Sequence, residues 1–141
     1  MPNQQGNRKR RSYRVVIPRP ERLRQLRSTA FGWIDARLWR DGWLIAMQPS
    51  DIAVYLFLCL VANHQGVSWY RRDRIGEALN LSEAETRRSL RRLIELDLIA
   101  YTPFSRHDSE GFRQVLSLPS SGPTSSSSSE TVSQLWAAKD R

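Results

Sequence analysis

Cysteine and histidine, which form disulfides and many metal sites, are scarce in this sequence of 141 residues. With one cysteine and two histidines, the chain can form no internal disulfide and lacks the paired ligand spacing of a zinc site. It has no glycine-rich phosphate loop and no nucleophile placed beside a base. We therefore expect a protein that is not an enzyme, with no cofactor, no metal and no small-molecule ligand.

Long hydrophobic runs are also missing. The apolar run at residues 52–62 falls well short of the roughly 20 residues that a membrane-spanning helix needs, and no secretory signal is visible. We expect a cytoplasmic, nucleoid-associated protein without a membrane partner. Cys59 lies inside this run and is expected to be a small buried side chain.

Positive charge, in contrast, is present in excess and is concentrated in one segment. Residues 1–30 carry the whole net charge of +8, because they contain nine Lys or Arg and a single acid, Glu21. The rest of the chain has equal numbers of basic and acidic residues. Such a basic arm suits contact with DNA phosphates. The alternatives are an RNA-binding or nuclear-localisation-like tract, or a solubility tail. The candidate contact residues of the arm are Arg8, Lys9, Arg10, Arg11 and Arg14.

The stretch from residue 71 to residue 99 organises the chain, because two amphipathic helical patterns meet there at a tight break, residues 79–82. Ser82 and Glu85 have the spacing of a capping box, which predicts that the second helix begins at this point. That helix, about Ser82–Leu96, has an apolar stripe at helical spacing formed by Thr86, Leu90, Leu93 and Ile94.

Four arginines lie mainly on the other side of this second helix. At about 100° per residue, Arg87 falls on the flank of the buried face, and Arg88, Arg91 and Arg92 fall on the far side. A short helix, a turn and an arginine-bearing helix form the helix-turn-helix arrangement, whose second helix lies in the DNA major groove. The alternative is an ordinary solvated face, with these arginines paired to Glu83, Glu85 and Glu95.

A hydrophobic helix and an aromatic segment precede this motif. Residues 52–62 are apolar almost all round, which is typical of a helix buried on most sides, and Gln48 with Pro49 suits its start. The aromatic-rich segment Phe31–Leu44 is expected to pack across this helix. A dimer or partner surface at Trp39 and Trp43 is the alternative.

A hairpin is predicted to follow the arginine-bearing helix. Residues 98–101 and 112–118 have the pattern of two strands, joined by a polar loop at residues 105–111. Placed after a helix-turn-helix, this hairpin is a wing, with Arg106 and Arg113 as candidates for contact with the DNA backbone. Arg71, Arg72 and Arg74, at the start of the first helix of the motif, oppose its dipole and suggest phosphate contact. The alternative is simple neutralisation by Asp73 and Glu77.

The composition divides the chain into three parts: a basic arm at residues 1–30, a folded domain at 31–118 and a C-terminal segment at 119–141. The last part is a serine-rich linker, followed by a short amphipathic stretch whose apolar residues include Trp136. This stretch suits either docking into a partner's groove or a tail without a role.

Residues 48–118 resemble the winged helix-turn-helix superfamily of prokaryotic DNA-binding proteins, including small proteins of mobile elements, plasmids and phages. The resemblance rests on Pro49-Ser50-Asp51 with Val54-Tyr55-Leu56, on residues 75–82, and on residues 90–99, where Asp97 stands in place of the family's usual glycine. It implies a mainly α domain with a small β-hairpin, a three-helix core plus wing. It also implies that residues 82–96 enter the major groove, that the wing touches phosphate or the minor groove, and that dimers are common.

These features predict a bacterial protein that binds double-stranded DNA, as a transcriptional regulator or as a DNA-binding component of a mobile element. The alternative is an adaptor subunit of a larger nucleoprotein complex, acting in replication, transposition or an RNA-guided process. A homodimer or protein partner would then be held through Trp39, Trp43 or Trp136. Besides the arm, the predicted nucleic-acid-binding residues are Arg71, Arg72, Arg74, Ser82, Glu85, Arg87, Arg88, Arg91, Arg92, Arg106 and Arg113.

Overall fold

The computed structural model describes residues 15–24 and 31–123, which fall into two units divided between Ala30 and Phe31. In the first unit, residues 15–24 are all exposed and contain a single turn of 3₁₀ helix, η1 (Pro20–Arg22). The predictions for Arg8, Lys9, Arg10, Arg11, Arg14 and Trp136 lie outside the described residues.

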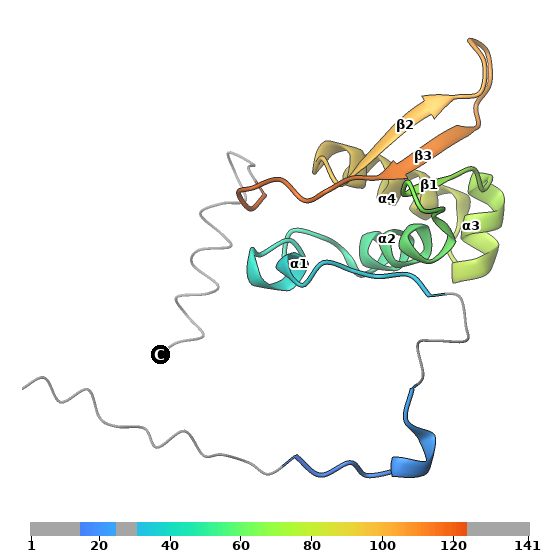
Figure 1. The fold of residues 1–141 in the computed structure, drawn as a ribbon. Coiled ribbons are helices and arrows are strands. Elements are labelled where there is room, and N and C mark those ends of the chain that lie inside the picture. The colour runs from blue at the N-terminus through green and yellow to red at the C-terminus, as the bar shows by residue number, and fades with distance from the viewer. Residues whose placement is uncertain (1–14, 25–30, 124–141) are drawn as a thin grey trace, which may run out of the picture. The chain divides into compact units, whose positions relative to one another are not determined.

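The second unit is mainly helical with a small antiparallel sheet (Figure 1), as the sequence predicts. The strand order is β1-β3-β2, so β3 is central, and the arrangement is consistent with a winged helix-turn-helix domain. No helix in the described part of the chain is long and apolar enough to span a bilayer. The elements are α1 (Arg37–Arg40), α2 (Pro49–Val61), β1 (Val67–Ser68), α3 (Arg72–Leu79), α4 (Glu83–Glu95), β2 (Ile99–Pro103) and β3 (Gly111–Val115).

Both long helices begin at capping groups that are visible in the sequence. At α4 the Glu85 backbone N–H donates to Ser82 Oγ at 3.2 Å, and the Ser82 N–H donates to Glu85 Oε2 at 2.9 Å, which completes the predicted capping box. At α2 the Gln48 N–H donates to Asp51 Oδ2 at 2.8 Å. These local bonds fix where each helix starts before any tertiary contact is considered.

The turn between α3 and α4 is tight because the backbones approach closely. Asn80 takes a left-handed conformation with φ of 55°, and the Leu81 N–H donates to the Gly76 carbonyl at 2.9 Å. A Cβ on Gly76 would lie 2.9 Å from the Leu81 oxygen, so glycine is required there. Asp97, after α4, is also left-handed with φ of 61°, and it occupies the position where the resemblance has glycine.

The core lies where α2 packs against α3 and α4, with Leu58, Ile75 and Leu93 almost fully buried. Trp43 joins this core at 2% exposure. The prediction that the other aromatic residues of residues 31–44 also pack inward is wrong, since Phe31, Trp33 and Trp39 are 63%, 75% and 63% exposed. The four-residue helix α1 has too little inward surface to bury more than Leu38 beside Trp43.

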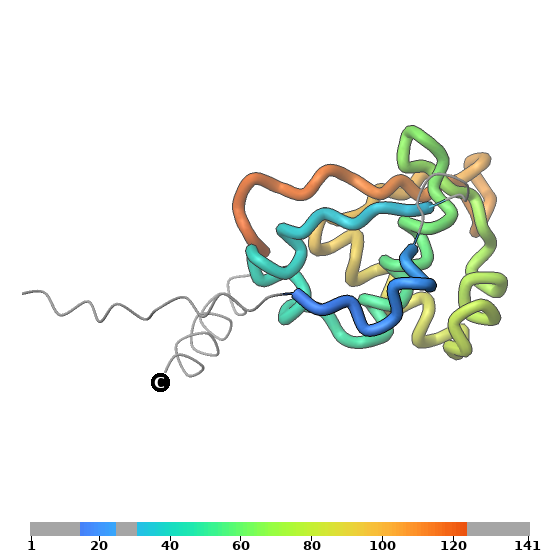
Figure 2. The backbone as a smooth tube through the Cα atoms, turned by 60° about the horizontal axis from the view of Figure 1, so that its bottom comes forward, coloured from blue at the N-terminus to red at the C-terminus, as the bar shows by residue number. Residues whose placement is uncertain are grey.

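Two extended segments close the domain around α2. In the first, Gly32 lies so near the Cys59 carbonyl that a Cβ would meet it at 2.6 Å. The second continues β3 past the buried Leu118 and returns to the segment around α1 (Figure 2). There Gly122 lies against the Asp41 carbonyl. Packing therefore extends to residues 119–123, which the sequence assigns to the linker.

Candidate nucleic-acid interface

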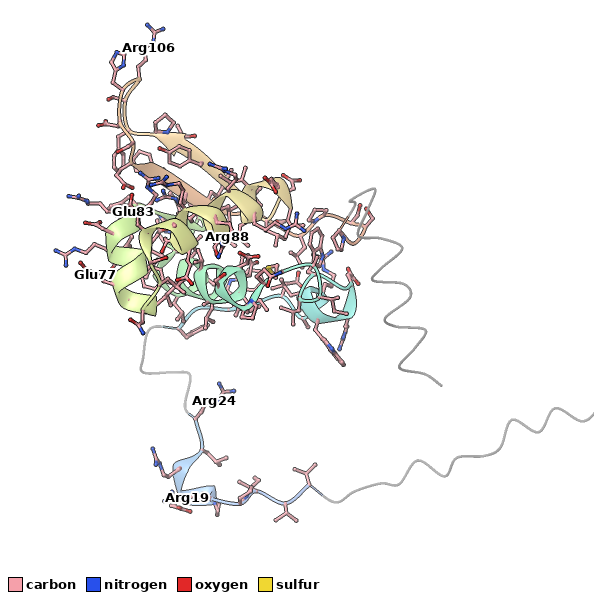
Figure 3. All side chains as sticks on the ribbon, turned by 180° about the vertical axis from the view of Figure 1, so that it is seen from behind. Arg19, Arg24, Glu77, Glu83, Arg88 and Arg106 are labelled. Atoms are coloured by element: carbon pink, nitrogen blue, oxygen red, sulfur yellow. The ribbon has the colours of Figure 1, made fainter. Side chains whose placement is uncertain are left out.

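The outward face of α4 presents two arginines that have no partner within the described residues. The inward face, formed by Thr86, Leu90 and Leu93, is at most 4% exposed. Arg88 (Figure 3) and Arg91 lie three residues apart on the opposite side, and both are exposed. Neither forms an ion pair or side-chain hydrogen bond inside residues 31–123. Their guanidinium groups are therefore available to an external acceptor.

Arg87 is exposed but paired. Its Nη2 lies 2.8 Å from Glu83 Oε1, one turn earlier on the same helix, with the two side chains 52% and 69% exposed. An exposed pair at this spacing contributes only about 0.3–0.5 kcal/mol. A phosphate can therefore compete with Glu83 for Arg87 at little cost.

Arg92 turns toward the protein instead of solvent. Its Nη2 donates to the Ala46 carbonyl at 3.1 Å, its Nη1 lies 3.7 Å from Glu95 Oε2, and the side chain is 31% exposed. Helical geometry gives the direction of the Cα–Cβ bond but not where the end of a long side chain comes to rest. The sequence predicts that Arg92 faces solvent together with Arg88 and Arg91. In the structure Arg88 and Arg91 are exposed, whereas Arg92 is bound to the protein.

Ser82 and Glu85 lie at the start of α4, where each is engaged by the backbone N–H of the other. At the start of α3, Arg71 and Arg74 are exposed and form only surface ion pairs, with Asp73 at 3.3 Å and Glu77 at 3.5 Å. These two arginines remain accessible from solvent.

The β2–β3 hairpin with its loop, residues 99–115, is here called the wing, and it projects beyond the helices. Arg106 lies at its tip, exposed and without an ion pair in the described chain (Figure 3). Of the predicted contacts in the wing, Arg106 is therefore accessible in this structure.

Arg113 is not accessible, because β3 turns it toward the core. It is 5% exposed, its Nη1 donates to the Tyr70 carbonyl at 3.0 Å, and its guanidinium lies 5.2 Å from the centre of the Tyr101 ring. Burial lowers the pKa of Arg113, opposed by the nearby Glu110 carboxylate. Its prediction as a contact to the DNA backbone is corrected accordingly: Arg113 holds the wing together from inside.

Glu110, a residue that sequence reasoning missed, links the wing to the helix-turn-helix. Both of its carboxylate oxygens lie 3.3 Å from the backbone N–H of Arg72, the first residue of α3. The Arg72 side chain approaches the same carboxylate at 3.6 Å and Arg113 at 3.7 Å. An acid from the wing thus caps α3 and balances two arginines, which explains why Arg72 is only partly exposed.

A groove of about 650 Å³ lies elsewhere in this unit, between residues 31–37 and 114–118, with Tyr55 and Cys59 lining it. Burial raises the pKa of both these groups, and a hydrogen bond from Arg37 lowers the pKa of Asp35 at the groove's edge. No group of three or more possible metal ligands occurs among residues 15–24 and 31–123. The groove contains none of the predicted nucleic-acid contacts.

Comparison with known proteins agrees with this geometry. A family model described as a helix-turn-helix domain matches residues 47–99, which include α2, α3 and α4. No curated protein and no solved structure matches the chain. The match and the arrangement of α2, α3 and α4 together support a helix-turn-helix fold, and this fold supports a role in binding DNA.

Proposed function

We propose that the chain binds double-stranded DNA sequence-selectively, with α4 in the major groove, as a transcriptional regulator or as the DNA-binding component of a mobile element. The observation that carries the proposal is the pair Arg88 and Arg91, which are exposed, close together and without partners among residues 31–123. Arginine can pair with the O6 and N7 atoms of guanine through two hydrogen bonds, and this is the commonest specific contact to a base.

Other exposed arginines would contact phosphates. Arg71 and Arg74 lie at the start of α3, Arg87 is held only by a surface ion pair, and Arg106 lies at the tip of the wing. Contacts of this kind fix the register of a protein on the duplex without reading its sequence. Arg72, Arg92 and Arg113 are not included, because each is turned toward the protein.

A binding experiment on full-length protein tests the assignment. Sites enriched from a random duplex pool should bind at least about 1,000-fold more tightly than random duplex. Arg88→Ala or Arg91→Ala should each weaken binding to an enriched site by about 5- to 150-fold, which corresponds to about 1–3 kcal/mol for each base that is no longer read. Arg40→Ala, an exposed arginine on α1, is the matched control. Equal affinity for all duplexes, or unaltered binding by both α4 variants, would contradict the proposal.

The basic arm has a separate test. Removing residues 1–14 deletes five basic side chains, so binding to every duplex should weaken by a similar factor. The slope of log affinity against log salt concentration should also fall, by about 0.9 for each phosphate that the protein no longer neutralises. A deletion that changes only the preference among sequences would show that the arm reads bases instead.

Genome-wide footprinting separates the two biological roles, because a regulator occupies promoter regions and a mobile-element component occupies the ends or origin of its element.

The exposed aromatic side chains Trp33 and Trp39 favour a second candidate, an adaptor that holds a protein partner. A pull-down with the Trp39→Ala variant, and one with a chain that lacks residues 124–141, tests it. Loss of a partner with retained DNA binding would support the adaptor.

A further inference from the structure

A row of exposed aromatic rings crosses the solvent face of the sheet, and the proposed duplex contact does not use it. Trp69 directly follows β1, Phe112 lies in the central strand β3, and Phe104 directly follows β2. The ring centroids of Trp69 and Phe112 are 6.3 Å apart, and those of Phe112 and Phe104 are 4.8 Å apart, both in edge-to-face contact. We call these three rings the aromatic row.

Strand register places the aromatic row on the outer face. Phe112 pairs with Thr102, and Gln114 pairs with Val67, so these residues share one side of the sheet. The neighbours that alternate with them, such as Ser68 and Arg113, are 3% and 5% exposed and face the core. The outward positions of the sheet, residues 67, 69, 100, 102, 104, 112 and 114, include no charged side chain.

The rings keep much of their surface open. Trp69, Phe112 and Phe104 are 57%, 44% and 45% exposed. Trp69 and Phe104, at the two ends, each contact only the central ring of the row, and an edge-to-face contact covers at most one face of a ring. Each end ring therefore has at least one face that the aromatic row itself does not cover, and such faces are where unpaired bases stack.

Positive charge stands at both ends of the aromatic row. Arg71 and Arg106 follow Trp69 and Phe104 by two residues, and both are exposed. Arg71 has a surface ion pair with Asp73 at 3.3 Å, and Arg106 has none within residues 31–123. An apolar face alone would suit a protein partner equally well, but the flanking guanidinium groups of Arg71 and Arg106 favour a polyanion.

From this arrangement we propose that the aromatic row binds single-stranded DNA. Unpaired bases stack on Trp69 and Phe104, their phosphates contact Arg71 and Arg106, and Gln114 and Thr102 offer hydrogen bonds to base edges. DNA is chosen over RNA because the helix-turn-helix domain supports a DNA-binding role. The aromatic row is distinct from the outward face of α4, so unpaired bases and duplex base edges would be contacted by different side chains, while Arg71 and Arg106 would serve the phosphates of either.

Affinity measurements on full-length protein test the proposal. Trp69→Ala and Phe104→Ala should each weaken binding to a labelled oligo(dT) by about 5- to 150-fold, the effect of losing one stacked base, and should leave duplex binding unchanged. Trp39→Ala, which removes a more exposed ring from α1, should change neither. Arg88→Ala should weaken duplex binding only, so the failure of this proposal and that of the proposed function can be told apart. Circular dichroism confirms that each variant is folded.

Photo-crosslinking identifies the contact directly and is not masked by the basic arm. The three rings fall in different tryptic peptides, residues 41–71, 93–106 and 107–113, so an oligonucleotide containing bromodeoxyuridine should label these peptides. Three results would overturn the proposal: crosslinks confined to the arm, tighter binding to oligo(rU) than to oligo(dT), or aromatic variants that bind oligo(dT) like the parent. A Trp69→Ala variant that binds oligo(dT) normally and instead lowers the sedimentation coefficient would assign the aromatic row to contact between copies of the chain.

Discussion

Two adjacent arginines of α4 should respond in opposite ways to the same substitution. Arg91 is exposed and pairs with no described residue, whereas Arg92 donates to the Ala46 carbonyl at 3.1 Å and is 31% exposed. Arg91→Ala should therefore lower DNA affinity and leave stability nearly unchanged, while Arg92→Ala should lower stability and leave DNA affinity nearly unchanged.

The size of the Arg92 effect follows from its contacts. A hydrogen bond to a charged group contributes about 1.5–3 kcal/mol when buried, and partial exposure of Arg92 reduces this to about 1 kcal/mol. For a domain of fewer than about 100 residues, such a loss lowers the melting temperature by about 4–8 °C. Arg91→Ala should stay within about 0.5 kcal/mol of the parent, as surface substitutions usually do.

Thermal unfolding followed by circular dichroism gives the stabilities, and anisotropy of a labelled duplex, well below the melting temperature, gives the affinities. Arg92→Lys, which keeps the charge but loses the planar guanidinium, serves as an intermediate variant. The reasoning is refuted if Arg92→Ala melts like the parent and binds DNA as weakly as Arg91→Ala, because Arg92 would then face the DNA in solution.

Three further predictions concern single residues. Glu110→Ala removes the cap of α3 and the carboxylate nearest the buried Arg113, so the free energy of unfolding in urea should fall by about 2–4 kcal/mol. Glu110→Gln should lose less. A loss below about 0.5 kcal/mol for Glu110→Ala would show that Glu110 does not link the wing to α3. Asp97→Gly relieves a left-handed conformation and should raise the free energy of unfolding by about 0.5–1 kcal/mol; a decrease would mean that the Asp97 side chain stabilises the corner. Cys59 is 8% exposed and burial raises its pKa, so Ellman's reagent should label the native thiol far more slowly than the urea-unfolded one; equal rates would place the thiol at the surface.

Local signals account for the parts of the fold that the sequence predicts well. The capping box at Ser82, Pro49 at the start of α2 and the apolar stripe through Leu90 act within one or two helical turns. Their geometry is set by neighbouring residues, so no knowledge of the tertiary structure is needed. The structure adds left-handed conformations at Asn80 and Asp97, each in the short turn that ends a helix.

Contacts between distant residues account for what could not be predicted. The Arg92 side chain ends on Ala46, and Glu110 reaches Arg72, separations of 46 and 38 residues. Alternation along β3 correctly separates Phe112 from Arg113, but alternation does not say which face meets the core. The sheet buries the arginine and exposes the phenylalanine, the reverse of what hydrophobicity alone favours.

The position of Glu110 also limits how this domain can be re-engineered. Wing loops are attractive places to exchange specificity, since a hairpin is easily treated as an independent module that can be grafted from one scaffold to another. Here the Glu110 carboxylate of the loop also caps α3, the first helix of the helix-turn-helix. A transplanted hairpin would have to place an acid at the same position. Otherwise the start of α3, the helix that precedes and supports α4, would lose its cap.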